Sequence, residues 1–191
     1  MTETKHAILR TRTAHAGWAK LLVATIRLPD GRTITREIED HGAAVCVLPY
    51  DPSRKTAVLV RQFRAPVSFA GGGDEMLEAV AGILEEGDPA DCARREAMEE
   101  AGLKLDSVER VFVGWTMPGL STERMHFYWA AYSGGFQARS GGVVADGEDV
   151  MPVEIGLGAL ADMADHGELA DVKTLLLVQT LRLRRPDLFV P

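Results

Sequence analysis

The sequence has few of the features that mark secreted or membrane proteins. Only two of its 191 residues are cysteine, Cys46 and Cys92, and their spacing suits neither a zinc site nor a disulfide framework. No apolar run approaches the roughly 20 residues that a membrane-spanning helix requires. The N-terminus also lacks the apolar region of a signal peptide. These absences predict a cytoplasmic protein without a membrane association, in which both thiols are reduced and structural.

An excess of basic residues is absent as well. Lys and Arg number 21 against 28 Asp and Glu, which gives a formal net charge of −7. This balance argues against a general nucleic-acid-binding protein, which would carry basic clusters. It leaves room for an anionic substrate, provided that a divalent cation lies between substrate and protein.

Periodicity predicts strands first and helices later. We expect one full hydrophobic core and strands at 18–28, 33–38, 43–49, 56–63, 108–115 and 125–132. Helices are expected at about 89–101, 157–165 and 173–184, and the glycine-rich segment 134–147 is typical of a loop. Because strands and helices do not alternate regularly, the fold class predicted is a mixed α/β (α+β) sandwich and not a βαβ repeat.

The first of these helices has well-defined ends. Asp88 is a suitable N-cap, Pro89 takes the first helical position, and Gly102 is the expected residue just beyond the C-terminus. Alanines recur every three or four residues within it, at positions 90, 93, 97 and 101. A small-residue stripe of this kind allows close packing on a sheet.

Three glutamates follow the same helical spacing. Glu96, Glu99 and Glu100 stand at i, i+3 and i+4, so their carboxylates can converge, although each like-charge pair opposes the helix by about 0.2–0.5 kcal/mol. A hard cation such as Mg²⁺ would reverse that repulsion. The alternative is an ordinary solvated helix face on which Arg95 pairs with Glu99.

The order of residues favours the cation. The segment from Arg95 to Leu103, REAMEEAGL, fills every specified position of R-E-U-x-E-E-x-G-U, where U is apolar, and so resembles the second half of the Nudix box. Gly82 resembles the glycine that opens the box. The interval between them is one residue shorter than the family pattern, and Gly87 and Asp88 stand where the pattern has a further glutamate.

The resemblance extends along most of the chain. It includes the Arg-Gln-Phe-Arg strand at 61–64, Pro118-Gly119 followed by Thr122-Glu123, the glycine-rich segment ending in Glu148-Asp149, and Lys173-Thr174. This pattern is most similar to the branch of the Nudix family that acts on nucleoside diphosphate sugars, and within it to the group that cleaves GDP-mannose. The resemblance implies a Nudix fold, in which a mixed β-sheet sandwich lies between helices and an N-terminal β arm precedes it.

The resemblance also implies roles for individual residues. The Ala81 carbonyl, Glu96, Glu100 and Glu148 would bind Mg²⁺, with Mn²⁺ as an alternative, and Glu148, Glu99 and Arg95 would assist catalysis. Asp146 and Asp149 compete with Glu148 for its role. Contacts to the nucleotide sugar are expected from Trp18, Arg36, Glu37, Arg64, Glu123 and Lys173.

The implied organisation is an arm at 1–40, through which a homodimer forms with or without exchange of the arms, and a hydrolase domain at 41–191. The implied reaction is Mg²⁺-dependent hydrolysis of a nucleoside diphosphate sugar to a nucleoside monophosphate and a sugar 1-phosphate, with GDP-mannose favoured. An ADP-ribose or ADP-sugar pyrophosphatase is the first alternative. A non-catalytic nucleotide-sugar sensor is the second.

Overall fold

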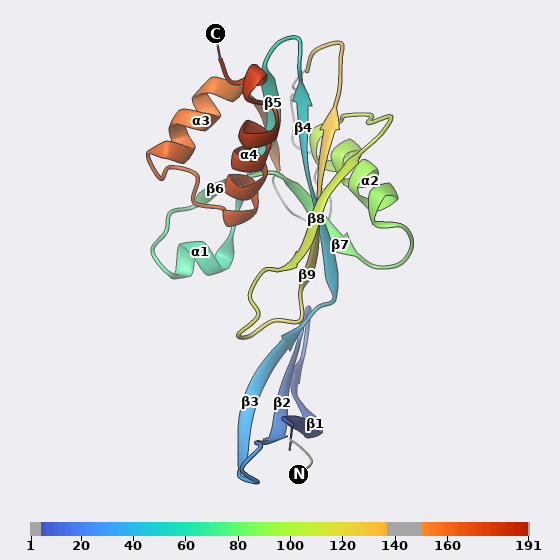
Figure 1. Ribbon diagram of the computed structural model, residues 1–191, viewed down its shortest axis with the longest axis vertical. Helices are drawn as coiled ribbons and strands as arrows, with labels where there is room; N and C mark the ends of the chain where they lie inside the picture. Colours follow the sequence, from blue (N-terminus) through green and yellow to red (C-terminus); the bar gives the residue numbers. More distant parts are fainter. Residues whose placement is uncertain (1–4, 137–149, 191) are drawn as a thin grey trace. The chain divides into compact units, whose positions relative to one another are not determined.

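The computed structural model describes residues 5–136 and 150–190, which form two compact units (Figure 1). The first unit contains the N-terminal residues as far as Ala43 together with Val113–Met125. The second contains Ala44–Phe112 and the residues from His126 onward. The boundary expected at residue 40 stays a prediction.

The first unit is built on a three-stranded antiparallel sheet of β1 (Ala7–Ala16), β2 (Lys20–Arg27) and β3 (Thr33–Asp40). At the β2–β3 turn, Gly31 has φ +84°, a backbone conformation that glycine adopts without strain. The sequence did not predict β1, because its residues are mostly polar and exposed. Pairing with β2 stabilises it, and the predicted strand at 18–28 starts only at Lys20, after a turn that contains Trp18.

The second unit contains most of a seven-stranded sheet. Its strands are β4 (Ala43–Asp51), β5 (Thr56–Phe63), β6 (Glu75–Glu78), β7 (Val80–Leu84), β8 (Glu109–Trp115), β9 (Arg124–Ala131) and β10 (Met151–Gly156). The main order is β10-β5-β4-β9-β8, with β6 paired to β5 and β7 paired to β4. The sequence did not predict the short strands β6, β7 and β10.

The helices are α1 (Ala65–Phe69), α2 (Pro89–Ala101), α3 (Leu157–Asp165) and α4 (Val172–Arg184), followed by a short 3-10 turn, η1 (Pro186–Leu188). The last three α-helices match their predicted positions, whereas α1 was not predicted. Figure 1 shows α2 on one side of the strands and α3 with α4 on the other. None of the helices in the described residues is long and apolar enough to cross a membrane.

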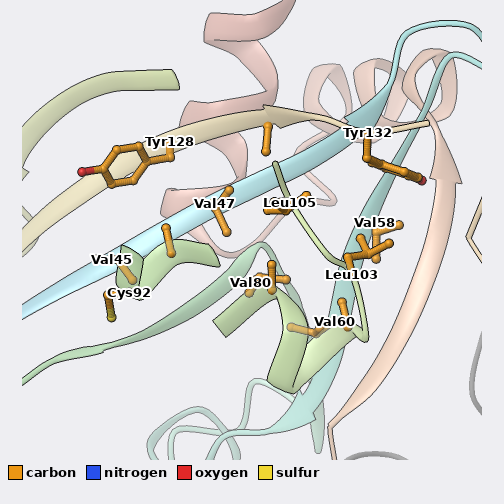
Figure 2. Packing of buried hydrophobic residues seen from close by; sticks show 14 of the residues in the cluster. Val45, Val47, Val58, Val60, Val80, Cys92, Leu103, Leu105, Tyr128 and Tyr132 are labelled. Carbon is orange, nitrogen blue, oxygen red and sulfur yellow. The ribbon is translucent and has the colours of Figure 1, made fainter. Parts of the chain in front are cut away.

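The core between α2 and the sheet is made mostly of small and branched side chains, together with Tyr128 and Tyr132. Val45, Val47, Val58 and Val60 come from β4 and β5 (Figure 2). The alanines of α2 belong to the same cluster. Ala93 and Ala97 are fully buried, as the alanine stripe predicted. Close packing of this kind holds α2 against the sheet, which sets the position of the glutamates that it carries. Cys46 and Cys92 are both buried.

Candidate active site

The ends of α2 are set by local hydrogen bonds. The carboxylate of Asp88 accepts from the backbone N–H groups of Ala90 and Asp91, and Gly102 ends the helix in the left-handed conformation. Asp88 therefore acts as a helix cap at the place where the family pattern has an additional glutamate.

Glu96 lies against the backbone of β7. A Cβ atom built on Gly82 would be 2.1 Å from Cδ of Glu96 and 2.4 Å from its nearer carboxylate oxygen, so only glycine leaves room for this carboxylate. Glu96 is nearly buried, and its pKa is raised by burial and by Glu99, although Arg95 opposes the rise. The opening glycine of the motif thus has a steric role beside the first helix glutamate.

Glu100 reaches the same strand one helical turn later. The Ala81 N–H donates to its Oε2 at 3.3 Å. Burial raises the pKa of Glu100 to about 8, with Glu96 adding to the rise and the Ala81 N–H and Arg64 acting against it. A buried and a partly buried carboxylate beside a backbone peptide form a set of hard oxygen donors, which suits a cation such as Mg²⁺.

Glu99 is placed differently from its two neighbours. Its side chain is 46% exposed and accepts from Nη1 of Arg95 at 2.8 Å, while Nη2 of Arg95 pairs with Glu96 at 2.7 Å. Arg95 therefore bridges Glu96 and Glu99. Within residues 5–136 and 150–190, no three His, Cys, Asp or Glu side chains are already arranged as a metal site.

A second cluster of charges lies at the end of β6. The fully buried carboxylate of Glu78 accepts from Nε of Arg64 at 2.6 Å and from its Nη2 at 3.0 Å, and it pairs with Nζ of Lys173 at 3.2 Å. The structure thus brings together two cations for which the resemblance predicts substrate contact. Sequence reasoning missed Glu78, although an acidic residue between Leu77 and Ala79 in an apolar run is a signal of a buried, paired charge.

The remaining predicted substrate residues belong to the first unit. Trp18 is 78% exposed, which excludes a core position, and its ring stacks on His41 with centroids 4.9 Å apart. Glu123 accepts from Nε2 of His41 at 3.0 Å and from Oγ1 of Thr116. His41, which the sequence did not single out, therefore links two predicted residues.

Arg36 and Glu37 are exposed neighbours on β3. The Arg36 guanidinium donates to the Thr35 carbonyl at 2.8 Å. Glu148, Asp146 and Asp149 lie outside the described residues.

Comparisons with known proteins agree with this geometry. A family model described as the NUDIX domain matches residues 40–170. The GDP-mannose pyrophosphatase of Cronobacter sakazakii is 39% identical over 158 residues, which is 81% of this chain and 82% of that protein. That of Salmonella arizonae is 40% identical over 149 residues (78% of each chain), and that of Escherichia coli is 37% identical over 157 residues (81% and 82%).

Among solved structures, an ADP compounds hydrolase superposes with a TM-score of 0.76 at 16% identity and covers 98% of this chain and 97% of its own. That likeness concerns the fold, and it confirms the mixed α/β architecture predicted from the sequence. The family match covers more than half of the chain and includes α2 and β7, where Glu96 and Glu100 meet Gly82 and Ala81. The chain therefore belongs to the Nudix family of hydrolases.

Proposed function

We propose that this protein hydrolyses the pyrophosphate bond of a nucleoside diphosphate sugar and releases a nucleoside monophosphate and a sugar 1-phosphate, with GDP-mannose as the favoured substrate. The observation that carries the proposal is a pair of carboxylates, the buried Glu96 and the partly buried Glu100, held against Gly82 and Ala81. The similarity to GDP-mannose pyrophosphatases over about four fifths of the chain supports the choice of substrate.

The donor set fits a divalent cation. Glu96, Glu100 and the Ala81 carbonyl would hold Mg²⁺ or Mn²⁺, with Glu148 as a further ligand or as general base. When bound, the cation supplies charge neutralisation at the phosphate oxygens and a more acidic water. Nearly all catalysis of phosphoryl transfer comes from such positioning and neutralisation.

The arginine and lysine side chains near the site have roles distinct from that of the metal. Arg95 holds the carboxylates of Glu96 and Glu99 by one guanidinium. We assign Arg64 and Lys173 to the phosphate oxygens of the substrate, since arginine offers a planar pair of donors and lysine a compact charge. Their positive charges reduce the electrostatic repulsion between the anionic substrate and the glutamates of α2.

The contacts to base and sugar come from the resemblance. We propose Trp18 as a stacking surface for the base, since most of its ring is exposed. Arg36 and Glu37 would read the base, and Glu123 would contact the sugar or distal phosphate.

We also propose a cytoplasmic homodimer formed through the arm. Sedimentation of the protein as a monomer at micromolar concentration in analytical ultracentrifugation would contradict the dimer.

A substrate panel tests the proposed reaction. GDP-mannose, ADP-ribose, ADP-glucose, UDP-glucose and NADH are each incubated with Mg²⁺ and with EDTA, and the products are separated by chromatography. Mg²⁺-dependent release of GMP and mannose 1-phosphate is expected. Preferred cleavage of ADP-ribose would support the proposed reaction but would change the assigned base from guanine to adenine. Cleavage of none, with Mg²⁺ binding intact, would contradict the proposal and favour a nucleotide-sugar sensor.

A further inference from the structure

The carboxylate of Glu78 joins three segments that are distant in sequence. Glu78 ends β6, Arg64 follows β5, and Lys173 lies in the first turn of α4. Only 1% of Glu78 is exposed, whereas the side chains of Arg64 and Lys173 are 34% and 22% exposed. The anion is therefore inside the protein, and the two cations that it holds reach toward solvent.

The cluster is closed on its inner side by α4. Asp171 accepts from Nζ of Lys173 at 2.6 Å with one oxygen and from Oγ1 of Thr174 at 2.6 Å with the other. The Thr174 hydroxyl in turn accepts from the Ala79 N–H at 2.6 Å. Two cations thus meet two anions, and Glu78 is linked through its neighbour Ala79 to the helix that carries Lys173.

The same cluster adjoins the acidic face of α2. Glu78 pairs with Val60 across β5 and β6, so both side chains point to the side of the sheet where Val60 packs in the α2 core. The Glu100 carboxylate accepts from the N–H of Ala81, which is only three residues after Glu78 along the chain. The segment from Glu78 to Ala81 therefore connects the cations held by Glu78 with the carboxylates to which we assign the metal.

We infer that Glu78 is a positioning residue, whose buried carboxylate holds Arg64 and Lys173 as a preorganised pair for the two phosphates of the substrate. The inference rests on the proposed function, because it needs a pyrophosphate at this place. By bonding Nε and Nη2 of Arg64, Glu78 sets the plane of the guanidinium before substrate binds. The side-chain entropy of a long arginine is then lost during folding and not during binding.

A purely structural role for Glu78 would have a different kinetic effect. Loss of a fold-stabilising ion pair reduces the folded fraction, which lowers kcat per total protein and leaves KM unchanged. Loss of preorganisation weakens binding of the substrate phosphates. Because these phosphates are already charged before the bond breaks, ground-state binding is affected, so KM rises while kcat changes less.

The test measures kcat and KM for GDP-mannose with Mg²⁺, the dissociation constant for inorganic pyrophosphate by calorimetry, and the melting temperature. The variants are Glu78→Gln, Glu78→Asp, Arg64→Ala and the double variant Arg64→Ala/Glu78→Gln. Glu78→Asp keeps the charge and shortens the side chain, so it tests the inference if Glu78→Gln does not fold. Glu154→Gln is the matched control, because Glu154 makes a bidentate pair with Arg54 at 2.5 and 2.6 Å elsewhere in the same unit.

For Glu78→Gln we expect KM and the pyrophosphate dissociation constant to rise about tenfold or more, as for loss of a hydrogen bond to a charged group. Glu78→Asp should raise both by a smaller factor, and Glu154→Gln should leave both unchanged. In the Arg64→Ala background the Glu78→Gln effect should shrink, because the two residues act as one unit.

An unchanged KM and pyrophosphate affinity in both Glu78 variants would overturn the inference, as would an equal rise in Glu154→Gln. The proposed function fails separately. If the wild type cleaves no nucleotide sugar but loses pyrophosphate affinity on Glu78→Gln, the proposed reaction is refuted and the positioning role remains.

Discussion

Replacing Gly82 with alanine perturbs the site by a single methyl group. The new Cβ would be 2.1 Å from Cδ of Glu96, and ordinary van der Waals contact begins at 3.4 Å, so the carboxylate must retreat by about 1.3 Å. The clashing atoms are the end of a flexible side chain, which can move without unfolding β7. The substitution should therefore displace the Glu96 carboxylate and leave the fold intact.

The expected loss of activity is large. A displacement of about 1 Å in a catalytic group can lower activity by roughly a hundredfold, so kcat/KM for GDP-mannose should fall by about that factor at saturating Mg²⁺. The melting temperature should change little, because alanine within a strand is favoured over glycine by roughly 0.5–1 kcal/mol, which offsets part of the strain. Steady-state kinetics and thermal denaturation measure the two effects independently.

Gly158→Ala is the control, because a Cβ at Gly158 meets no atom within 4 Å. That variant should keep wild-type kinetics. If Gly82→Ala also kept kcat/KM within about twofold of wild type, the Glu96 carboxylate could not occupy this position in the working enzyme, and the assignment of Glu96 as a metal ligand would be refuted.

Three further predictions concern other parts of the chain. Burial lowers the pKa of His41, but its bonds to Glu39 and Glu123 outweigh this and raise it above 6.5, so its stabilisation is complete below pH 6.5 and is lost as pH rises through the raised value. The melting temperature of His41→Gln should therefore fall further below wild type at pH 6 than at pH 9, and an equal deficit at both would contradict this. Gln62 has a buried amide nitrogen without a hydrogen-bond partner among the described residues. Gln62→Met should preserve or raise the melting temperature, because an unsatisfied buried group costs about 1–3 kcal/mol, and a marked fall would show that the amide is satisfied. Glu148→Gln should lower kcat by about a hundredfold or more if Glu148 is the base, and near-normal turnover would remove that assignment.

The parts of the structure predicted well are those determined by local sequence. The bounds of α2 were predicted because Asp88, Pro89 and Gly102 specify both ends through short-range hydrogen bonds and backbone preferences. The strand β1 was not predicted, since its polar residues become a strand only by pairing with β2. The short strands β6 and β7 likewise depend on partners elsewhere in the chain.

In the candidate site, too, the features determined by local sequence were predicted and those determined by distant contacts were not. The helical spacing of Glu96 and Glu100 predicted that they would converge, and both do reach β7. Glu99 does not join them, because its exposed carboxylate pairs with Arg95, which is the i, i+4 contact that the sequence offered as the alternative. Glu78 was missed because its partners are Arg64, just after β5, and Lys173 in α4, and no local pattern connects them.

The hydrogen bond between Ala79 and Thr174 has a consequence for the order of events during synthesis. The ribosome releases β6, β7 and α2 well before α4, which starts at Val172. Until Asp171, Lys173 and Thr174 emerge, Glu78 lacks one of its two cations and the Ala79 N–H lacks its acceptor. A nascent chain can thus form the motif helix early, yet the charges around Glu78 are balanced only after α4 docks. Completion of the site is in this way coupled to translation of the C-terminal helix.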